Sequence, residues 1–516
     1  MVGYSYQLSA RLPILRDPLL YGIIVVGLVV SAPFFRYVGW LGDEGVLLHA
    51  AVRVVGGEVL YRDIFGILPP GGYLIVATWM KVFGVGLASV RVLAVGVIVS
   101  IAVLIYAAAR LSSGSRPLAA LVAVAWAASS PGTLTIINHH WLTTAASMAA
   151  TVSLLLVGDG SVRRMAAFAA GLFAGTAVMI TSTRGALMCS AVLLVILTAP
   201  TSRVRAVSAI AGMAVIPAGM LLYVAAHGAL TEAIEDVIRY PALHYRGIQA
   251  VSFGSGALVE QLALVAIFPV AFALAAAVLA LGGAAQWSKP RFRVSLVVAV
   301  VGLLGSFPRP DSAHIAFTVP LACPLCALVA ASVPRSGRIA VTVLLVVLSL
   351  AGLAGTIGSA IMVNRSSVVA TARGVVVPGR RIPTGEFEDL ILAIDRAPSG
   401  SVFFFYPYDA LLPYLTGRRH AAAIDVMFPG YTTAAQFRDT CVRVTAEAQW
   451  VVIDRQWSDP DFLQRLFPAM RYPNPPEKVE FEAVLRADFD EIVYESRGFE
   501  LRKRSGRAPA ARCDRI

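Results

Sequence analysis

The chain has 516 residues, of which 57% are hydrophobic and only 14% are charged, and its formal net charge at pH 7 is +12. A water-solvated globule of this length needs more surface charge, so the composition excludes an ordinary soluble protein and makes lipid the expected solvent for most of the chain. The basic residues lie in short segments between apolar runs, where they set membrane topology. The net charge therefore does not indicate nucleic-acid binding, and no nucleic-acid partner is expected.

About eleven apolar runs before Met362 are typical of membrane-crossing helices. They cover residues 19–35, 88–109, 118–130, 142–157, 165–180, 186–198, 206–226, 258–281, 294–306, 315–332 and 339–362. The run 71–83 is too short to cross and carries Lys81, so we expect an interfacial helix there. Six basic segments then fall at every second crossing, which places them in the cytoplasm of a multi-pass protein of the inner or plasma membrane.

The composition changes after Met362, where charged residues, proline and aromatic residues become frequent. We therefore expect a transmembrane domain at 1–362, an extracytoplasmic α/β domain at 363–505 and a disordered tail at 506–516. Within the α/β domain, helix-like and strand-like patterns alternate, and a terminal hairpin follows. The expected helices are 387–396 and 433–448, and the expected strands are 401–406, 450–454, 491–495 and 499–503.

Two features of the α/β domain remain open from sequence. The aromatic run at 403–420 could stack on sugar rings, but contact with the membrane domain is the simpler interpretation. Cys441 and Cys513 could form a disulfide, although the sequence does not place them within bonding distance. Cys323 and Cys326 lie inside an apolar run, where packing is the expected role.

Unusual polar residues collect in the segments on the outer side of this topology, where charge is not needed for orientation. The first of these segments contains Gly-Asp-Glu-Gly at 42–45. Asp43 could simply cap a helix at 44–55, because an aspartate there accepts hydrogen bonds from backbone N–H groups. Capping does not explain the second carboxylate, Glu44, or the Tyr-Arg-Asp that follows at 61–63. The remaining residues of this group are Arg62, Asp63, His139, His140, Arg184, Arg309, Asp311 and His314.

An acidic pair soon after the first membrane helix, then Pro-Pro-Gly at 69–71 and an apolar segment ending in Phe-Gly at 83–84, resembles the GT-C superfamily of membrane glycosyltransferases. Protein O-mannosyltransferases and lipid A aminoarabinose transferases are the most similar members. The resemblance covers the order of elements to about Met362. It implies two interfacial helices, at 44–55 and 71–83, beneath a cavity open to the membrane. It also implies a polyprenyl-phosphate sugar donor and an aspartate, at the position of Asp43, whose carboxylate acts on the acceptor hydroxyl.

The residue types suit this chemistry. A carboxylate can take the proton of a sugar hydroxyl, while cations can hold the negative charge that grows on the leaving phosphate. We predict Asp43 and Glu44 as catalytic residues, with Asp43 as the general base of an inverting displacement. The candidates for the donor phosphate are Arg309 and His314, which we prefer, together with Arg184 and Arg62. The candidates for substrate binding are Asp63, His139, His140 and Asp311.

Each arginine has a structural alternative, because intramembrane ions usually pair, here Arg309 with Asp311 and Arg62 with Asp63. His139 and His140 stand where many GT-C relatives have an acidic residue. Neighbouring histidines point in different directions on a helix and no third ligand follows, so no metal site is predicted, although a divalent metal could take part.

The expected acceptor is a glycan, a lipid or an exported protein of the cell envelope. Two other functions fit a chain of many membrane helices. A transporter or flippase for a lipid-linked sugar predicts inverted repeats and charges at the membrane midplane, and the sequence shows neither clearly. A noncatalytic membrane scaffold predicts that Asp43→Asn has no effect.

Overall fold

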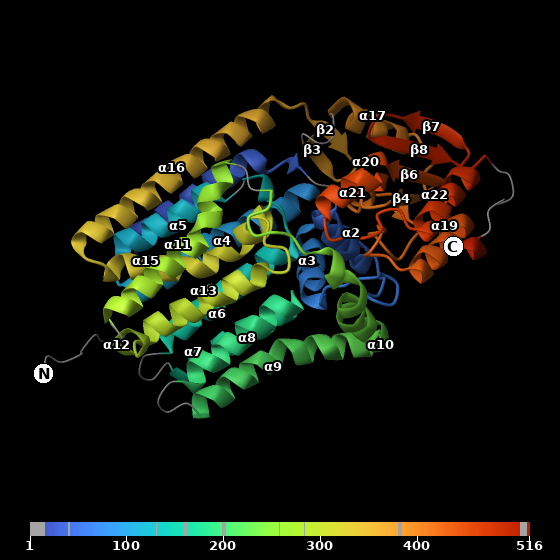
Figure 1. Cartoon of the computed structure of the whole chain (residues 1–516). Coiled ribbons are helices and arrows are strands. Elements are labelled where there is room, and N and C mark those ends of the chain that lie inside the picture. Colours follow the sequence, from blue (N-terminus) through green and yellow to red (C-terminus); the bar gives the residue numbers. More distant parts are fainter. Residues whose placement is uncertain are drawn as a thin grey trace, which may run out of the picture.

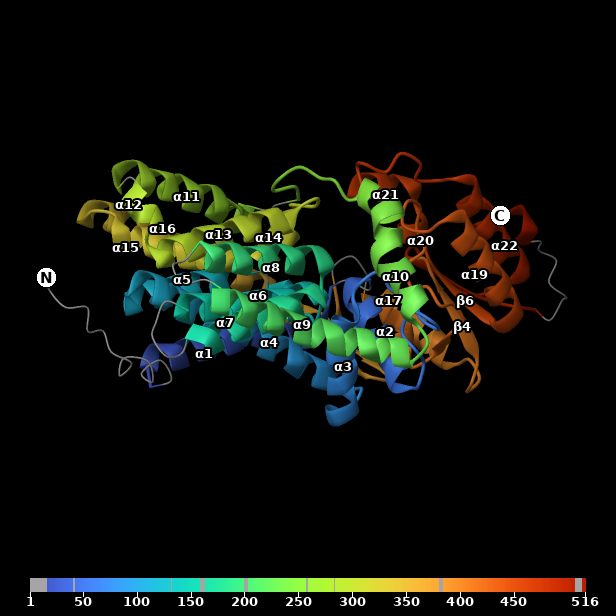
Figure 2. The same cartoon turned by 90° about the horizontal axis from the view of Figure 1, so that it is seen from below.

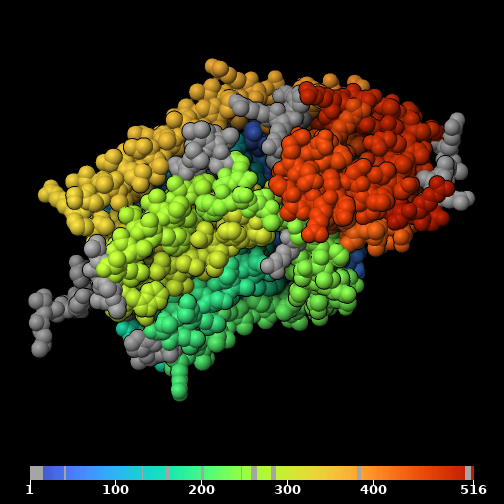
Figure 3. Space-filling view, viewed as in Figure 1, coloured from blue at the N-terminus to red at the C-terminus, as the bar shows by residue number. Residues whose placement is uncertain are grey.

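The computed structural model describes residues 16–39, 42–130, 132–157, 163–198, 203–256, 259–282, 284–379, 384–505 and 513–516. A bundle of apolar helices forms one end of the molecule, and a mixed sheet covered by helices forms the other (Figure 1). In the space-filling view, the residues after about 400 lie against one end of the bundle (Figure 3). The fold thus has a helical part and a C-terminal α/β part in contact.

The bundle contains the long apolar helices of the chain. They are α1 (Pro18–Ser31), α4 (Leu87–Ser113), α5 (Arg116–Ser129), α6 (His139–Leu156), α7 (Arg163–Val178), α8 (Ser182–Leu197), α9 (Arg203–Ala226), α11 (Val259–Gly282), α13 (Pro290–Ser306), α15 (Cys323–Ser332) and α16 (Arg335–Arg365). Shorter helical pieces are η2 (Ala32–Phe34), η3 (Gly132–Leu134), α12 (Ala284–Trp287), α14 (Ser312–Thr318) and η8 (Val319–Ala322). Every predicted apolar run falls on these helices.

Four helical stretches among the described residues are long and apolar enough to cross a membrane: Leu87–Ser113, Arg203–Ala226, Ser312–Ser332 and Arg335–Arg365. Large apolar side chains also point outward from the bundle, as with Leu222 on α9 and Leu350 on α16. Such a surface fits lipid and marks a membrane protein. That about eleven helices span the bilayer stays a prediction.

Two amphipathic helices, α2 (Asp43–Val55) and α3 (Pro70–Phe83), lie between the bundle and the α/β part (Figure 1). Helix α2 begins with two acidic residues, which the positive end of a helix dipole stabilises. Helix α3 begins at Pro70, whose fixed φ suits a first helical turn. Both helices were predicted in the first outer segment. Their interfacial position in a membrane stays a prediction.

The segment that follows α9 runs between the bundle and the α/β part (Figure 2). It contains the short turns α10 (Leu230–Ile234), η5 (Glu235–Arg239), η6 (Pro241–Tyr245) and η7 (Arg246–Ile248). Near the end of the bundle, β1 (Tyr37–Val38), β2 (Val369–Thr371) and β3 (Gly374–Pro378) form a small sheet in the order β1-β3-β2.

The larger sheet has the strand order β5-β4-β6-β8-β7. Its strands are β4 (Val402–Tyr406), β5 (Arg419–His420), β6 (Trp450–Asp454), β7 (Glu491–Glu495) and β8 (Phe499–Lys503). Its helices are α17 (Thr384–Asp395), α18 (Leu411–Thr416), α19 (Ala434–Glu447), α20 (Arg455–Ser458), α21 (Pro460–Leu466) and α22 (Pro476–Asp488). Strands β4, β5 and β6 run parallel, whereas β8 is antiparallel to both β6 and β7.

Every residue of β4 and β6 is buried, as expected for parallel strands with helices on both faces. Successive side chains of a strand point to opposite faces of the sheet. Phe403 therefore packs with buried residues of α17 and α18, and Phe404 packs with buried residues of α19 and α22 on the other face. The alternation of strands and helices predicted after Met362 falls on these elements.

The end of the chain is held to this sheet. Cys441 and Cys513 form a disulfide with their Cα atoms 5.8 Å apart, which answers a question that the sequence left open. A short turn, η9 (Cys513–Arg515), follows the disulfide, and the side chain of Ile516 is buried. These four residues belong to the stretch expected to be a disordered tail. The rest of that stretch, from 506 to 512, lies outside the described residues.

Candidate active site

Glu44 belongs to a buried ion pair. Arg91 of α4 donates to both of its carboxylate oxygens, with Nη2 to Oε2 at 2.8 Å, and the backbone N–H of Ile137 donates to Oε1 at 3.1 Å. The side chains of Arg91 and Glu44 are 0% and 1% exposed. Glu44 was predicted to be catalytic. The structure does not place it among groups open to a substrate, because Arg91 neutralises and encloses its carboxylate, so we reassign it to holding α2 on the bundle.

Asp43, one residue earlier, points the other way and is exposed. Its Oδ1 accepts a hydrogen bond from the hydroxyl of Tyr408, a residue 365 positions later that belongs to the C-terminal part. Burial, and then the charge of Asp43, raises the pKa of Tyr408 well above its ordinary value. The phenol therefore remains a protonated donor at physiological pH. No motif in the sequence pointed to Tyr408 specifically; it lies in the aromatic run that was assigned to contact between the two parts.

Three of the predicted residues form a compact group at the start of α14. Asp311 caps α14 by accepting a hydrogen bond from the backbone N–H of His314 at 2.9 Å, and its Oδ1 also lies 2.7 Å from Nδ1 of His314. Nε of Arg309 donates to Oδ2 of Asp311 at 2.8 Å. Burial alone would raise the pKa of Asp311, but the hydrogen bonds and charge of His314, together with the charge of Arg309, lower it to about 2. The carboxylate is therefore ionised at neutral pH.

Arg184 and the two adjacent histidines join this group. Nη1 of Arg184 lies 2.9 Å from Nδ1 of His140, and its Nε donates to the carbonyl of Gly305 at 2.7 Å. The ring of His140 lies 5.0 Å from that of His314 and 3.8 Å from that of His139. The sequence assigned these residues to one face of the membrane, and the structure brings them together. The name basic cluster is used below for His139, His140, Arg184, Arg309, Asp311 and His314.

Aromatic side chains connect Asp43 to the basic cluster. The guanidinium of Arg309 lies 4.9 Å from the ring centre of Phe467, and that ring stacks on Phe428 at 5.1 Å. Phe428 in turn lies 5.7 Å from Tyr408, the partner of Asp43. Burial and, to a smaller extent, the negative charge of Asp43 raise the pKa of Tyr245 to about 12, while the positive charge of Arg309 opposes this rise. Both charges thus act on the same tyrosine.

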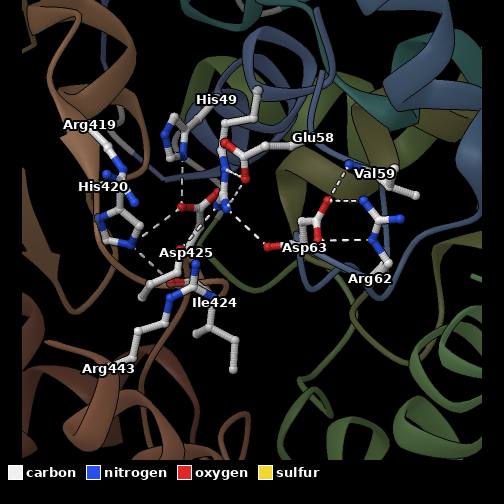
Figure 4. Close-up of polar contacts among 12 residues, drawn as sticks. His49, Glu58, Val59, Arg62, Asp63, Arg419, His420, Ile424, Asp425 and Arg443 are labelled. Atoms are coloured by element: carbon white, nitrogen blue, oxygen red, sulfur yellow. Dashed lines mark hydrogen bonds and ion pairs between the residues drawn. The ribbon is translucent and has the colours of Figure 1, made fainter. Parts of the chain in front are cut away.

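Arg62 and Asp63 lie elsewhere. Nη2 of Arg62 pairs with Oδ2 of Asp63 at 2.9 Å, and the Arg62 side chain is 51% exposed. In Figure 4 this pair lies to the right of His49 and Asp425, and the carbonyl of Asp63 accepts a hydrogen bond from Nη2 of Arg53 at 3.0 Å. The structural alternative therefore describes the Arg62–Asp63 pair, and we find no contact of Arg62 with the basic cluster among the described residues.

A second buried polar group joins α2 to the C-terminal part. Nδ1 of His49 lies 2.8 Å from Oδ1 of Asp425, and Nε2 of His420 lies 3.8 Å from the same oxygen (Figure 4). Burial lowers the pKa of His420 to about 3, which keeps this ring neutral. Nη1 of Arg53 donates to the carbonyl of Ala422 at 3.1 Å. These contacts fasten one side of α2 to the loop after β5.

Two buried carboxylic acids, Asp409 and Asp454, lie at the ends of neighbouring strands close to Tyr408 in the chain or the sheet. Asp409 follows the strand β4 and Asp454 ends the neighbouring strand β6. Asp454 accepts hydrogen bonds from the N–H groups of Gln456 and Trp457, at 2.7 and 3.0 Å, whereas neither oxygen of Asp409 has a donor among the described residues. Burial, and then the neighbouring carboxylate, raises the pKa of Asp409, while burial raises that of Asp454 to about 6. The pair therefore holds a proton near neutral pH.

A metal site is not evident in the described part of the chain, where no group of three or more histidine, cysteine, aspartate or glutamate residues could hold an ion. The chemistry available at this site is that of one exposed carboxylate, several cations and aromatic walls.

Comparison with known proteins gives a fold. No protein-family model matches the sequence, and no curated protein matches it significantly. Among solved structures, ArnT from Cupriavidus metallidurans bound to undecaprenyl phosphate is 14% identical with a TM-score of 0.58, over 96% of this chain and 99% of that chain. The oligosaccharyltransferase AglB from Archaeoglobus fulgidus, in complex with an inhibitory peptide and a dolichol-phosphate, is 11% identical with a TM-score of 0.55, over 90% of this chain and 72% of that chain.

The arabinofuranosyltransferase AftD from Mycobacteria is 16% identical with a TM-score of 0.52, over 95% of this chain and 40% of that chain. These proteins are GT-C glycosyltransferases. The chain therefore has the GT-C fold, and the resemblance stated from residues 42–84 is confirmed at that level. At such low identity the likeness concerns the fold, so activity is argued below from the site.

Proposed function

We propose that this protein is an inverting glycosyltransferase that moves a sugar from a polyprenyl-phosphate donor to a hydroxyl of an envelope acceptor. One observation carries the proposal: the exposed carboxylate of Asp43 and the guanidinium of Arg309 contact the two ends of one row of aromatic rings, formed by Tyr408, Phe428 and Phe467. A base and a phosphate-binding cation must both reach one bound sugar, and a shared aromatic wall supports that arrangement.

The reaction follows from these groups. Asp43 takes the proton of the acceptor hydroxyl, whose oxygen then bonds to the anomeric carbon as the bond from that carbon to the phosphate oxygen breaks. The electron pair leaves with the phosphate, where Arg309 and Arg184 of the basic cluster stabilise the growing charge. Asp311 holds Arg309 and His314 in place. A single displacement inverts the anomeric configuration, because no covalent glycosyl-enzyme forms.

The donor class draws support from the solved structures, since ArnT was found with undecaprenyl phosphate and AglB with dolichol-phosphate. The charge distribution supports an outer location. The C-terminal part contacts α2 at one end of the bundle, whereas Arg110 and Arg116 pair with Asp17 near the other end of α4. Because arginine-rich ends favour the cytoplasm, the positive-inside bias supports an extracytoplasmic position for the site and for the domain at 363–505.

The test uses the purified full-length protein in proteoliposomes, with radiolabelled polyprenyl-phosphate pentoses and hexoses as donors and washed envelope membranes as acceptors. We expect Asp43→Asn to lower transfer by about 100-fold, as loss of a general base does. We expect Arg309→Gln to raise the donor KM by about ten-fold, because one charged contact with the phosphate is lost. Arg62→Gln is the matched control and leaves both constants unchanged, since Arg62 lies away from the cluster.

The outcomes separate the competing functions. Transfer by Asp43→Asn at the wild-type rate would contradict the proposed base. Movement of labelled donor across the vesicle without any glycosylated product would favour a flippase. Extraction of the labelled product into solvent, or its digestion by protease, distinguishes lipid, glycan and protein acceptors.

A further inference from the structure

One face of α2 is built to receive the C-terminal part. Gly42, Gly45, His49 and Arg53 succeed one another at intervals of three or four residues, so they share one side of the helix. A Cβ at Gly42 would overlap the ring of Tyr408, and one at Gly45 would overlap the backbone between Ala410 and Leu411. The two glycines around Asp43 and Glu44 thus leave room for segment 408–411 to lie directly on the first turn of α2.

The position of Tyr408 in this contact is fixed from several sides. Its ring meets that of Trp457 edge-on at 4.7 Å and that of Phe428 at 5.7 Å, and the residue is only 9% exposed. The backbone on either side of Tyr408 is also held. The N–H of Met427 donates to the carbonyl of Pro407 at 2.8 Å, and the N–H of Leu412 donates to the backbone carbonyl of Asp409 at 2.8 Å. These contacts therefore fix the direction of the Tyr408 hydroxyl.

From this arrangement we infer that Tyr408 is a positioning residue of the active centre, through which the C-terminal domain completes the site. Its hydroxyl holds Oδ1 of Asp43. The second oxygen, Oδ2, is then turned toward the acceptor hydroxyl. The inference rests on the proposed function of Asp43 as the base. A carboxylate on a short side chain rotates readily, and a fixed donor on one oxygen removes that freedom before the reaction begins.

The fixed orientation predicts a specific kinetic effect. Tyr408→Phe keeps the ring that packs on Gly42 and Trp457 and removes only the hydroxyl. We expect kcat to fall by about ten-fold with the donor KM unchanged, because orientation of the base matters in the transition state and not in donor binding.

Tyr414→Phe is the matched control. Tyr414 is another buried tyrosine of the C-terminal part, and its hydroxyl also bridges to the other part of the chain by donating to the carbonyl of Val85 at 2.9 Å. It makes no contact with Asp43 in the described structure. If Tyr408 acted only by docking the two parts, Tyr414→Phe would lower kcat equally. We expect it to stay within about two-fold of wild type.

The double variant shows whether Tyr408 acts through Asp43. In the Asp43→Asn background, Tyr408→Phe should add less than about two-fold, since residues acting as a unit are not additive. The same ten-fold loss in both backgrounds, an unchanged kcat for Tyr408→Phe, or an equal loss in Tyr414→Phe would each overturn the inference. An unaffected Asp43→Asn would instead overturn the proposed function, whereas an impaired Asp43→Asn beside an unimpaired Tyr408→Phe would overturn this inference alone.

Discussion

The pairing of Glu44 with Arg91 makes a sharp prediction about the acidic pair at 43–44. Replacing Glu44 by glutamine leaves the guanidinium of Arg91 enclosed at 0% exposure without its counter-charge. An amide carbonyl in the place of Oε1 can still accept from Nη1 of Arg91 and from the N–H of Ile137, whereas an amide nitrogen in the place of Oε2 cannot accept from Nη2 of Arg91. Breaking a buried pair from one side costs about 3–5 kcal/mol, chiefly because the remaining charge is uncompensated. We therefore expect Glu44→Gln to unfold markedly earlier than wild type.

The assay follows thermal unfolding of the full-length protein in detergent micelles, alongside sugar transfer at a temperature where every variant is folded. The double variant Glu44→Leu with Arg91→Met removes both charges and should recover most of the loss, since apolar replacements of similar size tolerate such a site. Transfer by the double variant should stay within a few-fold of wild type. The reasoning is refuted if Glu44→Gln abolishes transfer while unfolding is unchanged, because Glu44 would then act in catalysis.

Two further predictions concern the C-terminal part. Because the pKa of Asp454 is raised to about 6 from an ordinary 3.8, the folded state binds more protons between these values, so its stability falls as pH rises through that window. Burial and the neighbouring Asp454 also raise the pKa of Asp409 well above its ordinary value. Asparagine is neutral at every pH, so Asp409→Asn should raise the unfolding temperature at pH 8, by an amount corresponding to about 1–3 kcal/mol, with little gain at pH 4. Exposed Asp439→Asn is the control, and equal gains at both pH values would contradict the account. Gly45→Ala should loosen the docking of segment 408–411 on α2 and make the C-terminal part more sensitive to limited proteolysis, whereas Gly22→Ala, where a Cβ meets no atom within 4 Å, should not.

Local pattern predicted much of this architecture, for physical reasons. Apolar run length and the distribution of arginine are set by the bilayer, so the helices of the bundle could be placed without tertiary information. Residues close in sequence could also be grouped, as with Arg309, Asp311 and His314 at the start of α14.

Contacts between distant segments could not be predicted. Asp43 and Glu44 are adjacent, but successive residues on a helix face different sides, and only the position of Arg91 decides which acid is enclosed. Tyr408 reaches Asp43 across 365 residues, where the C-terminal part packs on α2. Arg62 was grouped with the basic cluster because both were assigned to the outer side of the membrane. In the structure, however, Arg62 forms an ion pair with its neighbour Asp63.

The position of α2 has a consequence for protein engineering. This helix is fastened to α4 by Glu44 and to the C-terminal part by Tyr408, Asp425 and Ala422. A chimera that joins the helices of one GT-C protein to the C-terminal part of another at residue 362 would separate surfaces shaped for each other. A workable graft would carry residues 42–55 together with residues 363–505, so that helix and domain are exchanged as one unit.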